Sequence, residues 1–332
     1  MNKNKLKSKL KSKLKSNIYR HLKIIKLIFI IIIILVNVSI YLYIIYLINK
    51  GNNKKEIKVC VCTLGKEENR YIREYVEHYI NYGVDKIFLY DNNNIDGERF
   101  EEVINDYIEK GYVEVIDFRG KIRPMFRIIN DCYRKNYRHY NWLIYFEIDE
   151  YIYLKDFNNV KLFLNNSRFN NCPKIQLNWK FHTDNNLLHY DNRSLKVRFP
   201  EVSARARGVK TGGEEGIKTI IRGYIPGIKI DCIHRLNKKL KVCDGFGKLM
   251  ESYGISTKKA DYEYYYIDHY YSKSTEEFIH KLNKGDAFWR NNRMPRIINY
   301  FYENVITKEK IDYIENSTGL NLTEFRQKIT KI

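Results

Sequence analysis

The stretch Trp142-Leu-Ile-Tyr-Phe146-Glu147-Ile-Asp149-Glu150 decides the fold class, because an apolar run ends there in three carboxylates within four residues. The apolar run lacks the polar alternation of a half-exposed strand and therefore predicts a strand that is buried on both faces. Adjacent acids repel one another unless a positive group lies among them, and a divalent cation with oxygen ligands is the first candidate. A solvated acidic turn after a strand is the alternative. The sequence on either side decides between these two interpretations.

Strand and helix patterns alternate along the chain before this stretch. Strands are predicted at 57–63, 85–90 and 112–116, and helices at 66–82, 96–110 and 124–138. We expect Asp96 to cap the second of these helices. Such alternation predicts an α/β fold with a mostly parallel sheet, flanked by helices, in which the acids follow the fourth strand. Because ligands bind at the carboxyl ends of such strands, this position favours the cation over the acidic turn.

The pattern loosens after residue 155. We expect a helix at 157–169, a strand at 174–181, a mobile glycine-rich loop within 205–221, and mostly helical structure from 275 onward. The chain contains neither a G-x-G-x-x-G motif nor a P-loop. A nucleotide would therefore be held by polar groups at strand ends and by a metal, rather than by a glycine-rich phosphate loop.

The amino-terminal end combines a basic tail with a long apolar run. Residues 1–26 carry ten Lys and Arg and no acid, which is half of the formal net charge of +20. Residues 27–48 carry no charged side chain, and as a helix they would extend about 33 Å, enough to cross a hydrocarbon core of about 30 Å. A cleavable signal peptide would have a shorter apolar region of about 7–15 residues. We therefore expect an uncleaved transmembrane anchor in contact with membrane lipid.

The position of the basic charge sets the expected topology and argues against a nucleic-acid binder. By the positive-inside rule, 1–26 is a cytosolic tail, 27–48 is the anchor of a single-pass type II protein, and 49–56 is a short stalk. This topology predicts a Golgi or other secretory membrane for a eukaryotic or viral protein and the inner membrane for a bacterial one. The rest of the chain is only mildly basic and shows no RNA-binding motif, so no nucleic-acid partner is expected.

The chain has six cysteines, and none of them forms the C-x-x-C pair typical of metal sites. Cys60 and Cys62 point to the same face of a predicted strand, which is a poor geometry for a bond between them. In an oxidising lumen other pairs are open, and the sequence does not fix their connectivity.

Four ordered blocks between residues 57 and 290 resemble the GT-A-fold glycosyltransferases of the family-2-like and family-92 (DUF23-type) group. The first block runs from Cys62-Thr-Leu-Gly-Lys66 to Tyr90-Asp-Asn-Asn93, and the second runs from Asn130-Asp-Cys-Tyr133 through the acidic stretch. The third block is Asn178-Trp-Lys-Phe181, and the fourth is His269-Tyr-Tyr-Ser-Lys273 with the residues that follow it up to 286. The blocks keep their order along this range, which makes the resemblance specific.

The resemblance implies a GT-A-like, metal-dependent glycosyltransferase domain at 57–290, followed by a C-terminal helical extension at 291–332. The implied reaction moves a sugar, expected to be a hexose, from a nucleotide-sugar donor such as a UDP-sugar to a hydroxyl of a glycan or glycoconjugate. Direct displacement with inversion is the expected course. A membrane-anchored, non-catalytic relative that binds a glycan or a nucleotide is the alternative, since a fold alone does not prove a function.

The resemblance also implies a metal site. A Mn²⁺ or Mg²⁺ ion would hold the donor diphosphate on a D-x-D motif, in which Glu147 takes the first acidic position and Asp149 the second. Aspartate is more usual at the first position, so Asp149 is the stronger candidate for direct ligation. His269 is a further candidate ligand, and a hydrogen-bonded core histidine is the alternative for it.

Donor and acceptor contacts are expected at the remaining strand ends. The candidates for donor binding are Thr63, Glu68, Asp91, Asn93, Glu147 and Lys273. A plain turn of Asx residues is the alternative for Asp91 and the asparagines after it. Lys281 and Arg222 are further sources of positive charge for the diphosphate. Transfer also requires a base for the acceptor proton; Asp184 is the candidate, with a plain loop residue as the alternative.

Overall fold

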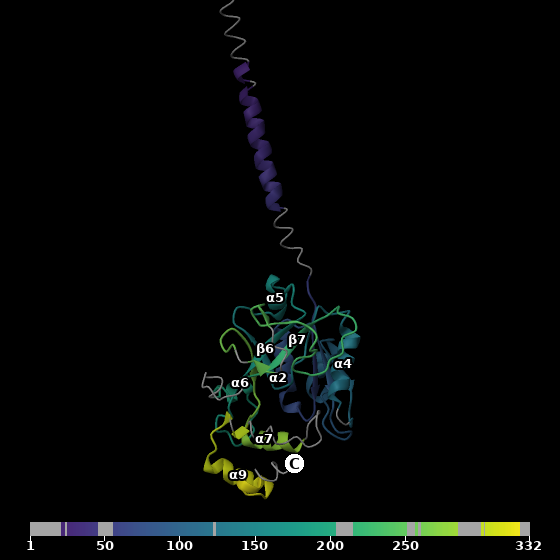
Figure 1. Cartoon of the computed structure of the whole chain (residues 1–332), viewed down its shortest axis with the longest axis vertical. Helices are drawn as coiled ribbons and strands as arrows, with labels where there is room; N and C mark the ends of the chain where they lie inside the picture. The colour runs from purple at the N-terminus through teal and green to yellow at the C-terminus, as the bar shows by residue number, and fades with distance from the viewer. Residues whose placement is uncertain are drawn as a thin grey trace, which may run out of the picture. The chain divides into compact units, whose positions relative to one another are not determined.

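The computed structural model describes residues 21–23, 25–45, 56–121, 124–203, 215–250, 256–257, 260–284, 300–301 and 303–325. The chain divides into two compact units, residues 1–56 and residues 57–332, and both are drawn in Figure 1. Most of the expected basic tail and stalk lies outside the described residues. The same holds for much of the expected glycine-rich loop and for the first part of the expected extension.

The first unit contains one long helix, His21–Ile45. By length and composition alone, this helix is apolar enough to cross a membrane. Within its apolar part, Asn37 and Ser39 donate hydrogen bonds to the carbonyls of Ile33 and Leu35, one turn earlier. The helix therefore satisfies these polar groups itself, as a lipid environment requires.

The amino-terminal half of the second unit is a parallel sheet. Its strands are β1 (Val59–Gly65), β2 (Lys86–Asp91), β3 (Val113–Asp117) and β4 (Trp142–Ile144). They lie in the order β3-β2-β1-β4, and every pairing among them is parallel. The chain therefore moves outward from β1 to β3 and then returns to the other side of β1. Open α/β sheets bind ligands at such a reversal, which here lies between the carboxyl ends of β1 and β4.

Side chains alternate across β1 and build a core on each face of the sheet. The connecting helices are α2 (Asn69–Asn81), α3 (Glu101–Glu109) and α4 (Met125–Asn136). Val59 and Val61 share a buried cluster with residues of α2 and α3, whereas Cys60 and Cys62 share another with residues of α4. Helices thus cover both faces, as the α/β expectation requires.

The carboxyl-terminal half extends the sheet with mixed strand directions. It contains β5 (Glu150–Leu154), β6 (Lys174–Phe181), β7 (Glu215–Arg222), β11 (Tyr265–His269) and the short strands β8 (Val242–Cys243), β9 (Leu249–Met250) and β10 (Ser256–Thr257). The order continues from β4 as β7-β6-β11-β5. Along this path only β6 and β11 are parallel. The predicted parallel character is therefore concentrated in the first half.

Two expected elements have different bounds. Strand β4 ends at Ile144, the last residue paired with β1 and β7, although the buried run continues to Phe146, whose carbonyl accepts a hydrogen bond from the Tyr75 hydroxyl. The expectation that Asp96 caps a helix is wrong. Helix α3 begins after Phe100 instead, and Asp96 lies in the preceding turn.

The expected helix at 157–169 is divided in two. It consists of α5 (Val160–Leu164) and a 3-10 turn, Ser167–Phe169. The side chains of Asn159 and Asn166 each accept a backbone N–H at the start of one piece. Two caps so close together end one helix and begin another.

The last helices belong to two buried clusters of the second unit. They are α6 (Leu195–Arg198), α7 (Thr275–Asn283) and α9 (Lys308–Thr318). Ser274 and Glu277 form a capping box at the start of α7. One buried cluster contains Tyr300 together with Phe278 of α7 and Ile314 of α9. Figure 1 shows α9 beside α7. The described part of the expected extension is thus packed on the expected 57–290 domain.

Two disulfides supply the connectivity that the sequence left open. Cys62 of β1 is bonded to Cys132 of α4, and Cys172 is bonded to Cys243 of β8. Each bond joins residues about seventy positions apart, which restricts the unfolded chain. Disulfides of this kind are typical of oxidising compartments.

Candidate active site

The acids lie on the connection between β4 and β5, which helix α2 holds in place. Tyr75 and Tyr79, one turn apart on the buried face of α2, donate hydrogen bonds to the carbonyls of Phe146 and Glu150 at 2.8 and 2.7 Å. The backbone N–H of Glu147 donates to the Glu150 carboxylate at 3.0 Å. Asp149 and Glu150 are therefore buried in a fixed segment rather than in a solvated turn, while Glu147 is partly exposed.

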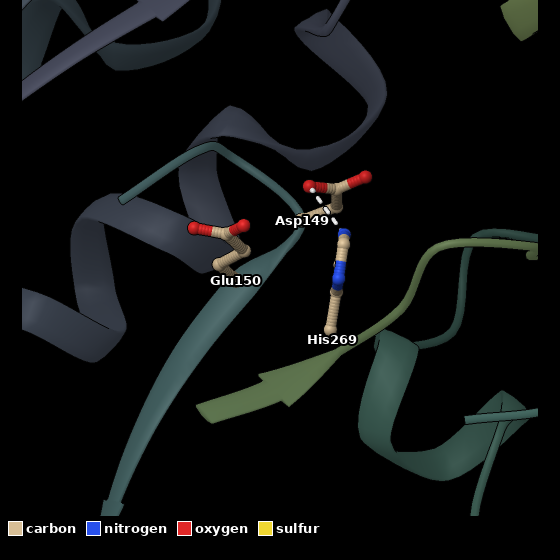
Figure 2. Close-up of side chains that lie close together, drawn as sticks. All are labelled: Asp149, Glu150 and His269. Atoms are coloured by element: carbon tan, nitrogen blue, oxygen red, sulfur yellow. Dashed lines mark ion pairs between the residues drawn. The ribbon is translucent and has the colours of Figure 1, made fainter. Parts of the chain in front are cut away.

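Asp149, Glu150 and His269 form the candidate metal site. The antiparallel pairing of β5 with β11 places Glu150 opposite His269, with Asp149 next to it. One possible ligand atom from each residue lies within 4.8 Å of the other two, and Figure 2 shows the two carboxylates beside the imidazole. The Nε2 atom of His269 is 3.6 Å from Oδ1 of Asp149. All three side chains are buried.

The donor set suits a divalent cation. The Oε1 atom of Glu150 is buried, and its ion-pair partner among the described residues is Nζ of Lys218, 3.3 Å away. Two carboxylates beside an imidazole are a ligand set that a divalent metal ion can use. Mn²⁺ accepts the mixed oxygen and nitrogen set, and Mg²⁺ prefers its oxygens.

Three lysines neutralise the acids, and we call Lys218, Lys273 and Lys281 the site lysines. The Nζ atoms of Lys281 and Lys273 lie 2.7 and 3.4 Å from Oδ2 of Asp149. The Nζ atom of Lys218 lies 2.8 Å from the Glu147 carboxylate and 3.3 Å from the Glu150 carboxylate. Lys218, on β7, has no exposed surface. The sequence alone does not single out Lys218, because one lysine within an apolar strand carries no pattern of its own.

Burial and charge oppose each other in the ionisation of these groups. Burial disfavours the charged form of Asp149, but the adjacent site lysines and the histidine outweigh it and hold its pKa well below the usual value. Lys218 outweighs burial in the same way and lowers the pKa of Glu147 to about 2. For Glu150 burial prevails and raises the pKa to about 8. Burial also lowers the pKa of His269, which favours the neutral imidazole that a metal requires.

Two of the expected donor-binding residues keep unsatisfied polar atoms at the neighbouring strand ends. The register of β1 with β2 places Gly65 beside Asp91. Asn93 accepts the N–H of Glu67 at 2.7 Å, while its Nδ2 atom and Oγ1 of Thr63 have no hydrogen-bond partner in the described part of the chain. Convergent buried polar groups beside the sheet reversal are what a nucleotide-binding site needs.

Asp91 has an internal partner that the sequence pattern does not reveal. The guanidinium of Arg119, after β3, lies 2.6 Å from Oδ2 of Asp91 and also donates to the carbonyls of Ile95 and Gly97. The other carboxylate oxygen of Asp91 accepts the N–H of Asn93 at 2.8 Å. These contacts are those of an Asx turn closed by an arginine, so contact of Asp91 with a nucleoside stays a prediction.

Glu68 and Lys273 connect the first strand end to α7. Glu68 is paired with Lys284 just after α7, and its Oε2 atom has no hydrogen-bond partner within the described residues. Lys273 has a backbone φ of +55°, in the left-handed region that non-glycine residues rarely adopt. Its ammonium lies 4.5 Å from the centre of the Tyr71 ring. Strained backbone of this kind is concentrated at functional sites.

Two residues expected in the site have structural partners instead. Asp184 is 1% exposed, and its Oδ2 atom lies 2.7 Å from Nζ of Lys310 and accepts the Tyr300 hydroxyl at 2.9 Å. The expectation that Arg222 serves a diphosphate is wrong. Arg222 is in register with Trp142, at the amino end of β4, whereas the acids follow its carboxyl end.

An aromatic layer supports His269. The Trp179 ring of β6 lies 4.6 Å from the His269 ring and 5.2 Å from that of His234, between ring centres. A Cβ atom at Gly216 would lie 2.0 Å from this indole, so the strand beside Trp179 requires a glycine there. The third block of the sequence contained Trp179, but only the packing shows that it supports the metal candidate.

The sheet reversal with its acids, flanking helices and mixed second half defines a GT-A-like α/β fold. The family model described as glycosyltransferase family 92 matches residues 55–317. The chain therefore belongs to glycosyltransferase family 92.

Similar proteins match over short segments. A glycosyltransferase family 92 protein of Oryza sativa subsp. japonica is 28% identical over 105 residues, which is 32% of this chain and 18% of that protein. The galactan beta-1,4-galactosyltransferase GALS2 of Arabidopsis thaliana is 31% identical over 91 residues, or 25% and 17%. The chain thus spans less than a fifth of the length of these relatives. The crystal structure of S. aureus TarS aligns with a TM-score of 0.35 and 10% identity, over 80% of this chain and 44% of that one.

Proposed function

We propose that this chain transfers a hexosyl group from a UDP-sugar to a hydroxyl of a glycan or glycoconjugate, with Mn²⁺ or Mg²⁺ bound at Asp149, Glu150 and His269. Membership of family 92 supports sugar transfer. The galactosyltransferase among the similar proteins supports a hexose. The observation that carries the proposal is the placement of Glu150 opposite His269 and beside Asp149 at the sheet reversal, with a possible ligand atom of each within 4.8 Å of the others.

Each group has a defined task in this proposal. The cation supplies charge for the leaving diphosphate, and Lys273 and Lys281 add positive charge beside it. Thr63 and Asn93 offer their unsatisfied polar atoms to the donor. Glu68, Asp91 and Glu147 shape the surrounding loops through Lys284, Arg119 and Lys218.

Direct displacement with inversion requires a base and no enzyme nucleophile. A base needs a carboxylate that the acceptor hydroxyl can approach. Asp184 is buried against Lys310 and Tyr300, so we do not include it in the reaction. The base is left unassigned.

The proposal places the second unit in an oxidising lumen. The apolar helix His21–Ile45 serves as the anchor of a type II protein, with the basic tail cytosolic. The disulfides Cys62–Cys132 and Cys172–Cys243 support this compartment, since such bonds are rare in the cytosol.

The test is sugar-nucleotide turnover by the purified full-length protein in detergent. A panel of UDP- and GDP-hexoses is supplied with Mn²⁺, Mg²⁺ or EDTA, with and without glycan acceptors, and release of the nucleotide is measured. We expect turnover of one UDP-hexose that requires the cation and is lost in Asp149→Asn. The exposed variant Lys155→Met, whose partner is Glu263, should behave as wild type. Binding of UDP without turnover of any donor would identify a non-catalytic relative instead.

A further inference from the structure

The positive charges around the acids at least match their negative charges before any cation binds. Glu147, Asp149 and Glu150 supply at most three negative charges, and the site lysines supply three positive ones at 2.7 to 3.4 Å. Glu150 has no exposed surface, and Asp149 is 7% exposed. A buried site with no net negative charge attracts a divalent cation poorly, because the ion loses hydration without a compensating charge.

Asp149 shows this conflict most directly. A cation bound with Glu150 and His269 could use Oδ1 of Asp149, which lies 3.6 Å from Nε2 of His269, but Lys281 at 2.7 Å and Lys273 at 3.4 Å hold Oδ2 of the same carboxylate. The ion would lie close to two ammonium groups of its own sign. These ammonium groups must therefore gain another negative partner before the cation can bind well.

A diphosphate removes the conflict. The diphosphate of a nucleotide-sugar carries about two negative charges, so cation and diphosphate together leave the charge of the buried site unchanged, which neither ligand achieves alone. Lys273 directly precedes the capping residue of α7, and Lys281 lies in the last turn of that helix. Their long, flexible stems let both ammonium groups change partner while the backbone stays in place.

We propose that Lys273 and Lys281 are exchangeable counter-ions of Asp149. They hold its carboxylate in the metal-free protein and pass to the diphosphate of the donor when the cation binds. Cation and nucleoside diphosphate then bind as a pair, and each raises the affinity for the other by the same factor. This inference rests on the proposed function, because it takes Asp149, Glu150 and His269 as the metal site. It adds the residues that couple metal binding to donor binding.

The direct measurement is Mn²⁺ binding to the full-length protein in detergent, followed by the electron paramagnetic resonance signal of free Mn²⁺. We expect saturating UDP to raise the Mn²⁺ affinity by about tenfold or more, within the usual range of coupling between sites. In calorimetric titration, Mn²⁺ added first should raise the affinity for UDP by the same factor. Neither readout depends on turnover.

Variants of Lys273 and Lys281 test whether these lysines couple Mn²⁺ binding to UDP binding. Lys281→Met and Lys273→Met each remove one competing ammonium, so Mn²⁺ should bind more tightly than to wild type in the absence of UDP. The coupling factor should fall toward one, because a phosphate contact is lost as well. Lys281→Arg keeps the charge and should retain most of the coupling. Lys155→Met, remote and exposed, is the matched control, and thermal unfolding shows which variants are folded.

The outcomes separate this inference from the function on which it rests. Equal Mn²⁺ affinity with and without UDP in wild type overturns the inference and leaves the metal site in place. So does weaker Mn²⁺ binding by folded Lys281→Met or Lys273→Met without UDP. If neither Mn²⁺ nor Mg²⁺ binds even with UDP present, the metal dependence in the proposed function is what fails.

Discussion

Two buried aspartates, each paired with a lysine at 2.7 Å, belong to different kinds of site. Asp184 and Lys310 have full sets of partners, including Tyr300 and a backbone carbonyl. Asp149 and Lys281 have the same separation, but Glu150 and His269 lie beside them as possible metal ligands and a second lysine competes for the same aspartate oxygen. A buried ion pair with all partners satisfied maintains the fold. A pair whose aspartate is shared by two lysines and lies beside further possible metal ligands is arranged for a ligand.

The largest expected effect concerns the Asp184 pair. Lys310→Met leaves a buried carboxylate without its counter-charge, which should lower the free energy of unfolding by about 3–5 kcal/mol. Urea denaturation measures this loss. Lys308→Met, on the same helix and paired with Asp312 at the surface, is the control and should change stability by less than about 1 kcal/mol. A more than tenfold fall in kcat of folded Lys310→Met protein would place Asp184 in the reaction after all.

The second effect concerns Asp149. Asp149→Asn removes the proposed ligand charge and should lower kcat by about 100- to 1,000-fold, the range for loss of a group that stabilises the transition state. Mn²⁺ binding in the presence of UDP should disappear with it. Urea denaturation should show a smaller loss of stability than in Lys310→Met. The reverse ranking, a folding defect with normal turnover, would make Asp149 a structural residue like Asp184.

A smaller effect on kcat is expected at Glu147, the acid at the position where aspartate is more usual. The Glu147 side chain is 39% exposed and is held by Lys218, and it lies outside the group that could hold a metal. Glu147→Gln should therefore lower kcat by less than about tenfold, or 1.4 kcal/mol, and leave Mn²⁺ binding with UDP close to wild type. A loss equal to that of Asp149→Asn would instead identify Glu147 as a direct ligand.

The smallest effect is a pH dependence at a third buried pair. Arg198 lies 2.7 Å from Glu277, and together with Ser274 and Tyr71 it outweighs burial and lowers the pKa of Glu277 below its usual value of 4.5. A carboxylate with a lowered folded pKa contributes stability above its unfolded pKa and loses it as pH falls through the folded pKa.

Glu277→Gln should therefore be destabilised most at neutral pH, and its difference from wild type should narrow as the pH falls below about 4.5. Thermal unfolding across this pH range measures the difference. Mn²⁺ and UDP should leave the difference unchanged, because this pair, like that of Asp184, is satisfied within the protein. If Mn²⁺ and UDP changed this difference, Glu277 would take part in ligand binding as Asp149 is proposed to do.

Much of the first half of the fold follows from the sequence. Strands β1 to β4 and their helices were predicted within a few residues, because periodic apolar positions in local runs specify them. The acids were expected at a strand end, and they lie at the sheet reversal. The Asp96 cap was wrong, since a possible capping residue does not show where a helix begins, and Phe100 takes that position. The base candidate Asp184 rested on chain position alone, and its lysine is 126 residues away.

The sequence by itself determined an apolar helix near the amino terminus, an α/β sheet and three acids after its fourth strand. Each of these rests on local periodicity or on neighbouring residues. Only the tertiary structure decided what neutralises the acids. The antiparallel pairing of β5 with β11 brings His269 opposite Glu150, and β7 and the α7 segment bring in the site lysines. No local sequence pattern encodes these contacts, because they join residues that are distant in the chain.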